Sequence, residues 1–296
     1  MIHHPKVAII GAGLAGLTIA YRLRQKNYDV DVYEARNRVG GRVHSVLLRN
    51  FDGEFSVGEL GGQNIADGGE AKYFRSLARE LALEFFEDEI EFSRAFFSEG
   101  KIFNPHRLLA EQKFNPKVLR ENLLEIGKTA QSIQEVLDSV FVENSILKRV
   151  FAFQISAYEG SSAHLLSIYH NLKTLEHGLL GGISEAHQVV SSKQTIQSTA
   201  LKKGNAVLPL KIAEIMHDKI HLAKVLTAVK WLENNRILLV FAGGREKIVD
   251  KLILAIPGSV YQDIHFDDKI IPTEQLKLIK RVQYGTNAKI LTPKFE

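Results

Sequence analysis

A short apolar strand that leads directly into a glycine-rich turn, within residues 6–16, is the feature that most constrains the fold. The strand sequence KVAII is typical of a central parallel strand that is covered on both faces. In the turn, Gly11 allows a tight bend, Gly13 lets the backbone approach a pyrophosphate, and Gly16 lets the next helix pack closely on the sheet. This order of strand, turn and helix predicts a dinucleotide-binding βαβ unit.

The residues after the turn extend the same unit. Leu14 and Ala15 open a helix whose positive N-terminal end would face the phosphates of a cofactor. A second strand, Asp29 to Tyr33, ends at Glu34, whose carboxylate can accept hydrogen bonds from the hydroxyl groups of an adenosine ribose. The unit alone is compatible with either NAD or FAD.

Composition narrows the class of protein. A chain of 296 residues is longer than one hydrophobic core usually organises, so we expect two domains. The absence of cysteine excludes disulfides, thiolate zinc sites, a catalytic thiol and a flavin attached through cysteine sulfur. The histidines do not have metal-ligand spacing, so we expect no metal. The net charge of +4 is mild and the basic residues are scattered, so we expect no nucleic-acid partner.

The hydrophobic runs are short. The longest, Ile237 to Ala242 and Leu252 to Ile256, are too short to cross a membrane, and no signal sequence precedes the first strand. We therefore expect a soluble, cytoplasmic protein without a transmembrane segment.

The hydrophobic pattern changes twice along the chain. Short strands and glycine-rich turns give way to mostly helical patterns, and the strands later return. The sequence therefore predicts an α/β fold, in which a discontinuous, Rossmann-like dinucleotide-binding domain contains an inserted, mostly helical domain. We place the dinucleotide-binding domain at residues 1–66 and 200–265, and the inserted domain at residues 67–199 and 266–296.

The individual elements follow from the same patterns. In the part between the two halves of the first domain, we expect a helix over residues 69–86, a β-like stretch over 90–103 with a turn at 98–100, and largely helical segments over 106–158 and 161–177. After the chain returns, we expect a helix over 208–217 and strands over 225–232, 236–241 and 247–255. Hairpin turns at Asn234-Asn235 and Gly243-Gly244 would connect these strands.

A second glycine loop follows Glu34 and is the reason to prefer FAD over NAD. Ala35 and Arg36 are followed by Gly40, Gly41 and Arg42. The paired glycines permit close backbone approach, and arginines on both sides can bind phosphate oxygens. A plain NAD domain has no need of this second phosphate-facing loop. With the βαβ unit, the Glu-Ala-Arg and Gly-Gly-Arg runs resemble the signature of the flavin-containing amine oxidase family, which includes monoamine and polyamine oxidases.

Further segments resemble this family in the same order. The turn Glu59 to Asn64 resembles the family's acidic-Leu-Gly-Gly turn, which implies that Gly61, Gly62, Gln63 and Asn64 approach the flavin ring. The segment Gly204 to Pro209 resembles the start of a helix in the returning FAD half. Val225 stands where the family places a valine whose backbone meets the adenine, and Ala255 lies in the strand end that precedes the return to the substrate domain.

The resemblance also implies a reaction. The segment Tyr284 to Ile290 resembles a family strand whose lysine, here Lys289, holds a water against flavin N5. It implies non-covalent FAD, hydride transfer from a small-molecule amine to flavin N5, hydrolysis of the imine, and reoxidation by oxygen. Three alternatives stay open: an FAD-dependent desaturase or protoporphyrinogen-oxidase-like enzyme, a non-catalytic flavin-binding protein, and, for Lys289 itself, a solvated lysine at a strand edge.

Family chains continue well beyond the lysine strand, through a C-terminal FAD segment that covers the flavin ring. This sequence stops at Glu296, so the resemblance implies a C-terminally truncated member of the family. We therefore expect a partner or a missing C-terminal segment to complete the flavin pocket.

Overall fold

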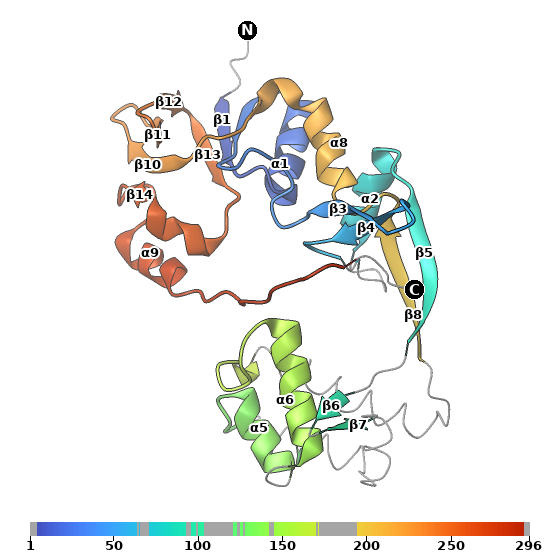
Figure 1. The fold of residues 1–296 in the computed structure, drawn as a ribbon. Helices are drawn as coiled ribbons and strands as arrows, with labels where there is room; N and C mark the ends of the chain where they lie inside the picture. The colour runs from blue at the N-terminus through green and yellow to red at the C-terminus, as the bar shows by residue number, and fades with distance from the viewer. Residues whose placement is uncertain are drawn as a thin grey trace. The chain divides into compact units, whose positions relative to one another are not determined.

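The computed structural model describes residues 5–63, 65, 71–92, 96–98, 100–103, 121–122, 125–126, 128–141, 145–169, 171 and 194–292. The chain divides into two compact units (Figure 1). Unit 1 contains residues 1–88, 198–283 and 289–296, and unit 2 contains residues 89–197 and 284–288.

Unit 1 is built on a four-stranded parallel sheet with the order β13-β1-β2-β9. These strands are β13 (Lys251–Leu254), β1 (Lys6–Ile10), β2 (Asp29–Tyr33) and β9 (Ile220–His221). In the central strand β1, Ile9 pairs with Val32 on one side and with Ile253 on the other. The four residues of β1 after Lys6 are all buried, as expected for a strand that is covered on both faces.

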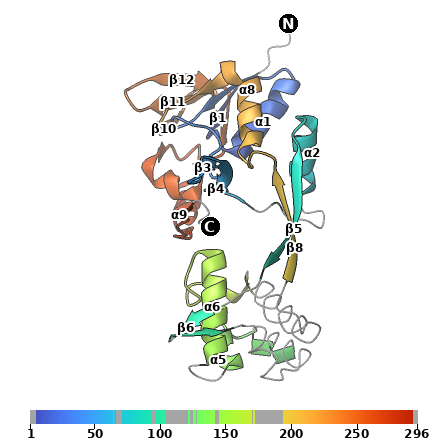
Figure 2. The same cartoon turned by 45° about the vertical axis from the view of Figure 1, so that its right-hand side comes forward.

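Helices cover one face of this sheet, and a second sheet covers the other (Figure 2). The helices are α1 (Leu14–Gln25) and α8 (Val207–Ile215), whose Leu17 and Ile212 share a hydrophobic core with Ile9. On the opposite face, Ile10 packs with Leu239 of the second sheet. These layers confirm the predicted α/β, Rossmann-like class of fold.

The second sheet has the order β12-β11-β10-β14 and consists of β12 (Glu246–Val249), β11 (Ile237–Phe241), β10 (Leu226–Trp231) and β14 (His265–Phe266). The hairpin turns that join β10 to β11 and β11 to β12 lie where the sequence predicted them. Asn235, Gly243 and Gly244 have φ values of 58°, 82° and 76°, and such left-handed conformations favour asparagine and glycine.

The strand predicted over residues 247–255 is in fact two strands in two different sheets. The chain leaves β12 and enters β13 at Asp250. There the Asp250 amide donates to the Lys6 carbonyl, and the Lys6 amide donates to the Asp250 carboxylate at 2.8 Å. This exchange anchors the crossing at the start of β1.

The remaining elements of unit 1 surround these two sheets. They include the hairpin of β3 (Ser45–Arg49) and β4 (Phe55–Glu59), the helices α2 (Lys72–Glu80) and α9 (Thr273–Lys280), and the 3₁₀ helices η1 (His217–Lys219) and η2 (Gly258–Asp263). Helix α2 ends at Glu80 and not near Phe86 as predicted, because Ala82 has a φ of 54° and Phe85 already begins the strand β5 (Phe85–Phe92). Strand β5 pairs with β8 (Gln194–Leu201).

Unit 2 contains a hairpin and two helices with their own core. The hairpin of β6 (Phe96–Ser98) and β7 (Lys101–Phe103) confirms the predicted turn near Gly100. Helices α5 (Ile133–Val140) and α6 (Ile146–Glu159) each begin after a serine whose hydroxyl accepts a hydrogen bond from the first turn. Val136, Leu137 and Phe151 are buried between them. Residues 106–120, 123–124, 127, 142–144, 170 and 172–177 of the predicted helical segments lie outside the described residues.

The boundaries of the compact units differ from the predicted domain boundaries. Residues 67–88, 266–283 and 289–296 belong to unit 1, although the sequence assigned them to the inserted domain. The reason for the first difference is that Leu77, Ala78 and Leu81, in and just after α2, pack into the same core as α1 and β1. Among the described residues, no helix is long and apolar enough to span a membrane.

Candidate functional site

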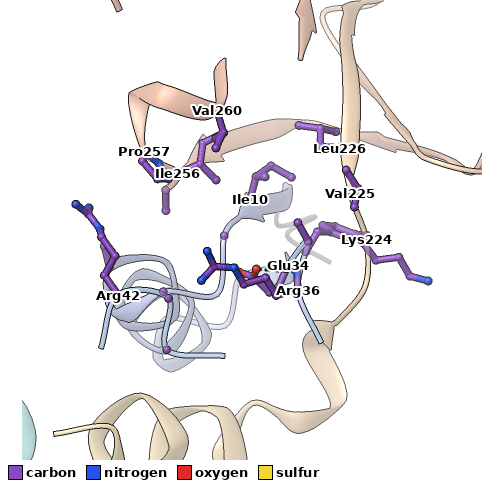
Figure 3. A pocket seen from close by; sticks show the side chains of 18 of the residues that line it. Ile10, Glu34, Arg36, Arg42, Lys224, Val225, Leu226, Ile256, Pro257 and Val260 are labelled. Atoms are coloured by element: carbon purple, nitrogen blue, oxygen red, sulfur yellow. Dashed lines mark hydrogen bonds between the residues drawn. The ribbon is translucent and has the colours of Figure 1, made fainter. Parts of the chain in front are cut away.

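A cavity of about 510 Å³ lies at the carboxyl ends of β1, β2 and β13 in unit 1 (Figure 3). This edge of a parallel sheet is where α/β proteins commonly bind ligands. The lining residues come from six segments: Ile10, Gly11 and Gly13–Ala15; Tyr33–Arg36; Gly40–Val43; Lys224–Leu226; Ala255–Pro257; and Val260, Asp263 and Ile264.

The first glycine turn forms the floor of this cavity. A Cβ on Gly11 would lie 2.6 Å from the Ala255 carbonyl oxygen, and a Cβ on Gly16 would lie 2.0 Å from the Gly11 carbonyl oxygen. Both positions therefore require glycine for backbone packing. A Cβ on Gly13 would meet nothing closer than the Cα of Gly41, at 4.0 Å. The side-chain space of Gly13 is open, as predicted for a position where a phosphate approaches the backbone.

The second glycine loop lies directly against the first. The Gly40 amide donates to the Ala12 carbonyl at 2.9 Å, and a Cβ on Gly41 would lie 3.1 Å from the Cα of Gly13. Both Gly40 and Gly41 have positive φ, at 93° and 58°. The guanidinium group of Arg38 donates to the Gly41 carbonyl at 3.1 Å and so holds the loop in place. The two glycine loops are 24 or more residues apart in the sequence, but in the structure they form one surface.

Glu34 lies at the cavity with both carboxylate oxygens engaged by backbone amides. Oε2 accepts a hydrogen bond from the Ala12 amide at 2.8 Å, and Oε1 accepts one from the Arg36 amide at 2.9 Å. A carboxylate offers about four acceptor positions, so capacity remains for two further donors. The two amides fix the orientation of the carboxylate, and the remaining positions suit a pair of ligand hydroxyl groups.

Arg36 and Arg42, together with Lys224, bring positive charge to the cavity. Both arginine side chains are exposed, and neither guanidinium group is hydrogen-bonded to any residue that the structure describes. In Figure 3, Arg36 lies beside Glu34, whereas Arg42 comes from the second glycine loop. Because these groups keep all their donors available, they can bind phosphate oxygens in the paired geometry that guanidinium favours.

Val225 and Ala255 line the cavity from two different segments, residues 224–226 and 255–257. Val225 precedes β10; its carbonyl accepts from the Ala242 amide at 2.8 Å, and its own amide donates to no described residue. Its neighbour Lys224 donates its amide to the Glu34 carbonyl at 2.8 Å, which ties this segment to the end of β2. Ala255 follows β13 and donates its amide to the Ile10 carbonyl.

A cluster of polar side chains supports the end of β2 behind the cavity. The ring of Tyr33 stacks on His221 with the ring centroids 4.9 Å apart, and His221 Nε2 lies 3.0 Å from an Asp31 oxygen. Burial would raise the pKa of Asp31, but the hydrogen bond with His221 and the charge of Lys247 outweigh it and lower that pKa below its ordinary value. Burial and the charge of Asp31 raise the pKa of Tyr33, so the phenol stays protonated at neutral pH.

The residues predicted to lie near the flavin ring are in contact with one another, but outside the cavity. Gly61, Gln63 and Lys289 lie in contact, since Lys289 Nζ donates to the Gly61 carbonyl at 3.1 Å and lies 3.4 Å from Gln63 Oε1. None of them, nor Gly62, lines the cavity. Lys289 is exposed and lies in an extended segment that belongs to no strand, unlike the strand that we predicted. Asn64 lies outside the described residues.

Comparison with known proteins shows the family. A sequence profile described as flavin containing amine oxidoreductase matches residues 14–292. The chain belongs to this family. It is 24% identical to Lysine-specific histone demethylase 1 homolog 1 of Arabidopsis thaliana, over 98% of this chain and 34% of that protein. It is 23% identical to the flavin-containing amine oxidase A of Canis lupus familiaris, over 98% of this chain and 56% of that protein.

A solved structure, that of cyclohexylamine oxidase from Brevibacterium oxydans, has the same fold as this member of the flavin containing amine oxidoreductase family. The TM-score is 0.68 at 19% sequence identity, over 94% of this chain and 63% of that one. The chain thus spans between a third and two thirds of the length of these three relatives. FAD is the cofactor of this family, which confirms the cofactor predicted from the two glycine loops.

The residues of the cavity fit the adenosine diphosphate half of FAD. Open space at Gly13 leaves room for a pyrophosphate, Arg36 and Arg42 supply positive charge, and Glu34 keeps free acceptor positions for ribose hydroxyls. The volume lies within the usual range of small-molecule sites, about 300–1,000 Å³. The turn predicted to meet the flavin ring lies outside this cavity.

Sequence reasoning missed a buried polar network beside that turn. Asn205 is buried, with only 4% of its surface exposed, and Glu59 and Ser45 bind the backbone around it. In the sequence, Glu59 and Asn205 stand out only as parts of segments that resemble the family, and no local pattern pairs residues 146 positions apart. The structure also adds Tyr33, Val43, Lys224 and Asp263 to the cavity lining.

Proposed function

We propose that the chain binds FAD non-covalently in the cavity of unit 1. In this proposal Gly11, Gly13, Gly16, Gly40 and Gly41 hold the pyrophosphate close to the backbone. Glu34 accepts hydrogen bonds from the ribose hydroxyls, Arg36 and Arg42 bind phosphate oxygens, and Val225 contacts the adenine through its backbone. The observation that supports this most strongly is the contact between the two glycine loops beside a carboxylate that two amides hold in place.

We further propose that the chain is part of an oxidoreductase that oxidises a small-molecule amine, with oxygen as the acceptor. FAD, when bound, would supply at N5 the acceptor for a hydride from the carbon that carries the amine; oxygen would then take the two electrons and water would hydrolyse the imine. Lys289 holds a water through its ammonium group, whose orientation depends on the Gly61 carbonyl and on Gln63. Family membership and the fold of cyclohexylamine oxidase support this proposal.

The predicted domain roles and location also remain proposals. We infer that unit 2, with its helices α5 and α6, is part of the substrate domain, and that the protein acts in the cytoplasm. The relatives are longer than this chain, so the flavin ring and the amine are proposed to contact additional protein segments as well.

A two-step experiment tests the proposal. The purified chain is first titrated with FAD, and binding is followed by quenching of flavin fluorescence. Saturable binding with one FAD per chain is expected, and no binding would contradict the proposed site. The loaded protein is then mixed with a panel of amines without oxygen. Loss of the visible flavin absorbance is expected with at least one amine, whereas unchanged absorbance with every amine would contradict amine oxidation but leave FAD binding in place.

A further inference from the structure

Both polar atoms of the Asn205 side chain form hydrogen bonds, although the residue is buried. Oδ1 accepts a hydrogen bond from the Leu201 amide at 3.1 Å. Nδ2 donates to the carbonyl oxygens of Gly62 and Gln63, at 3.1 Å and 2.8 Å. Among the described residues, tyrosine aside, it is the one buried residue with a polar or charged side chain. A buried amide is costly unless it is hydrogen-bonded, so these partners fix one orientation of the side chain.

The backbone around Asn205 is held to the same turn. The Asn205 amide donates to Glu59 Oε1 at 2.6 Å, and the Ala206 amide donates to the Ser45 hydroxyl at 2.9 Å. The Ser45 hydroxyl in turn donates to Glu59 Oε2 at 2.8 Å. A carboxylate is favourable at the positive N-terminal end of a helix, and here Glu59 takes that place for α8. Strands β3 and β4 are thereby fixed to the start of α8.

Two sets of hydrogen bonds hold the turn at residues 61–63. The Gly61 and Gly62 amides donate to the His44 and Arg42 carbonyls at 3.2 Å and 2.9 Å, which fixes the first half of the turn. The second half, the carbonyl groups of Gly62 and Gln63, is held by Asn205. The two hydrogen bonds from Asn205 Nδ2 fix the orientation of two successive peptide groups. The same turn offers Lys289 Nζ its acceptors, the Gly61 carbonyl oxygen and Gln63 Oε1.

We propose that Asn205 is a positioning residue for Lys289. It fixes the carbonyl groups of Gly62 and Gln63, and this holds the Gln63 backbone so that its side chain can accept from the lysine ammonium. The significance of Lys289 for the reaction rests on the proposed function. The contact chain from Asn205 to Lys289 stands on the geometry of unit 1 alone.

The test measures the acylation rate of individual lysines in the full chain, without FAD or amine, by mass spectrometry after brief treatment with acetic anhydride. In Asn205→Asp, the side-chain volume and the acceptor for the Leu201 amide remain, but the amide donor is replaced by an oxygen that faces the Gly62 and Gln63 carbonyl oxygens. Lys289 should react about three to ten times faster, because it loses the oriented Gln63 acceptor and one hydrogen bond is worth a few-fold in equilibrium. Lys277, which pairs with Glu274 on α9, serves as the reference lysine and should react at its original rate.

Two further variants complete the design. Asn205→Ala removes all three side-chain hydrogen bonds and should accelerate Lys289 at least as much; if it does not fold, Asn205→Asp decides. Asn50→Ala removes an amide that bonds Glu54 at the far end of the β3–β4 hairpin, and it should leave Lys289 unchanged. An unchanged rate for Lys289 in folded Asn205→Asp would overturn the proposal. Because no flavin is present, failure of FAD binding or of turnover would not produce that result.

Discussion

Replacement of Glu34 by alanine tests the ligand geometry of the cavity most directly. The carboxylate holds the Ala12 amide at 2.8 Å and the Arg36 amide at 2.9 Å, and its remaining acceptor positions are assigned to ribose hydroxyls. Loss of a charged hydrogen-bond acceptor costs about 1–3 kcal/mol. Glu34→Ala should therefore weaken FAD binding by that amount, which corresponds to a rise in Kd of about 5- to 150-fold.

The assay must separate this loss from damage to the glycine turn. FAD is titrated by fluorescence quenching at several protein concentrations, and thermal unfolding of the FAD-free chain is followed by circular dichroism. Glu84→Ala is the matched control, because Glu84 is an exposed carboxylate of unit 1 whose partner is Lys202. Its Kd for FAD should equal that of the original chain. An unchanged Kd in a Glu34→Ala protein that still unfolds cooperatively would refute the assignment of Glu34 to the ribose.

Three other outcomes are expected. Gly41→Ala should raise the Kd for FAD at least about tenfold, because a side chain at a φ of 58° is strained and its Cβ would lie 3.1 Å from Gly13; equal titration curves would contradict this. Lys289→Met should keep the flavin content and slow turnover or flavin reoxidation, and equal rates would return Lys289 to a surface role. Hydrogen bonding to Arg22 lowers the pKa of Glu80 to about 2, so this pair stabilises the fold above about pH 4.5 and the contribution is lost as the pH falls toward 2. Glu80→Gln should therefore lower the unfolding free energy at pH 7 by about 0.2–1 kcal/mol, and the difference should vanish near pH 2 in thermal unfolding.

The sequence predicted the parts of the site that depend on local backbone geometry. The spacing of Gly11, Gly13 and Gly16 follows from steric limits within one turn, so it could be interpreted without knowledge of the fold. Glu34 could be assigned because it directly follows a strand whose pattern is clear. The prediction of one strand over residues 247–255 passed over Asp250 and Lys251, two charged residues that interrupt the apolar run where the chain changes sheets.

Long-range contacts account for the other differences. Nothing near Asn205 in the sequence indicates that Glu59 and Gly62 surround it, since this depends on how the β3–β4 hairpin meets α8. The strand expected around Lys289 rested on the resemblance of residues 284–290 to a family strand, but the structure assigns no strand to residues 281–292. A strand forms only where a neighbouring strand completes its hydrogen bonds, and a single segment carries no information about that neighbour.

The position of β1 between β2 and β13 has a consequence for synthesis on the ribosome. Lys6 and Asp250, which hold the two ends of the crossing together, are 244 positions apart in the sequence. At about 5–20 residues per second, the ribosome needs about 12–50 s to add the residues between them. During that time β1 has emerged with one edge unpaired, and an apolar strand with an open edge is prone to pair with other chains. Nascent unit 1 should therefore depend on chaperone protection until β13 is complete.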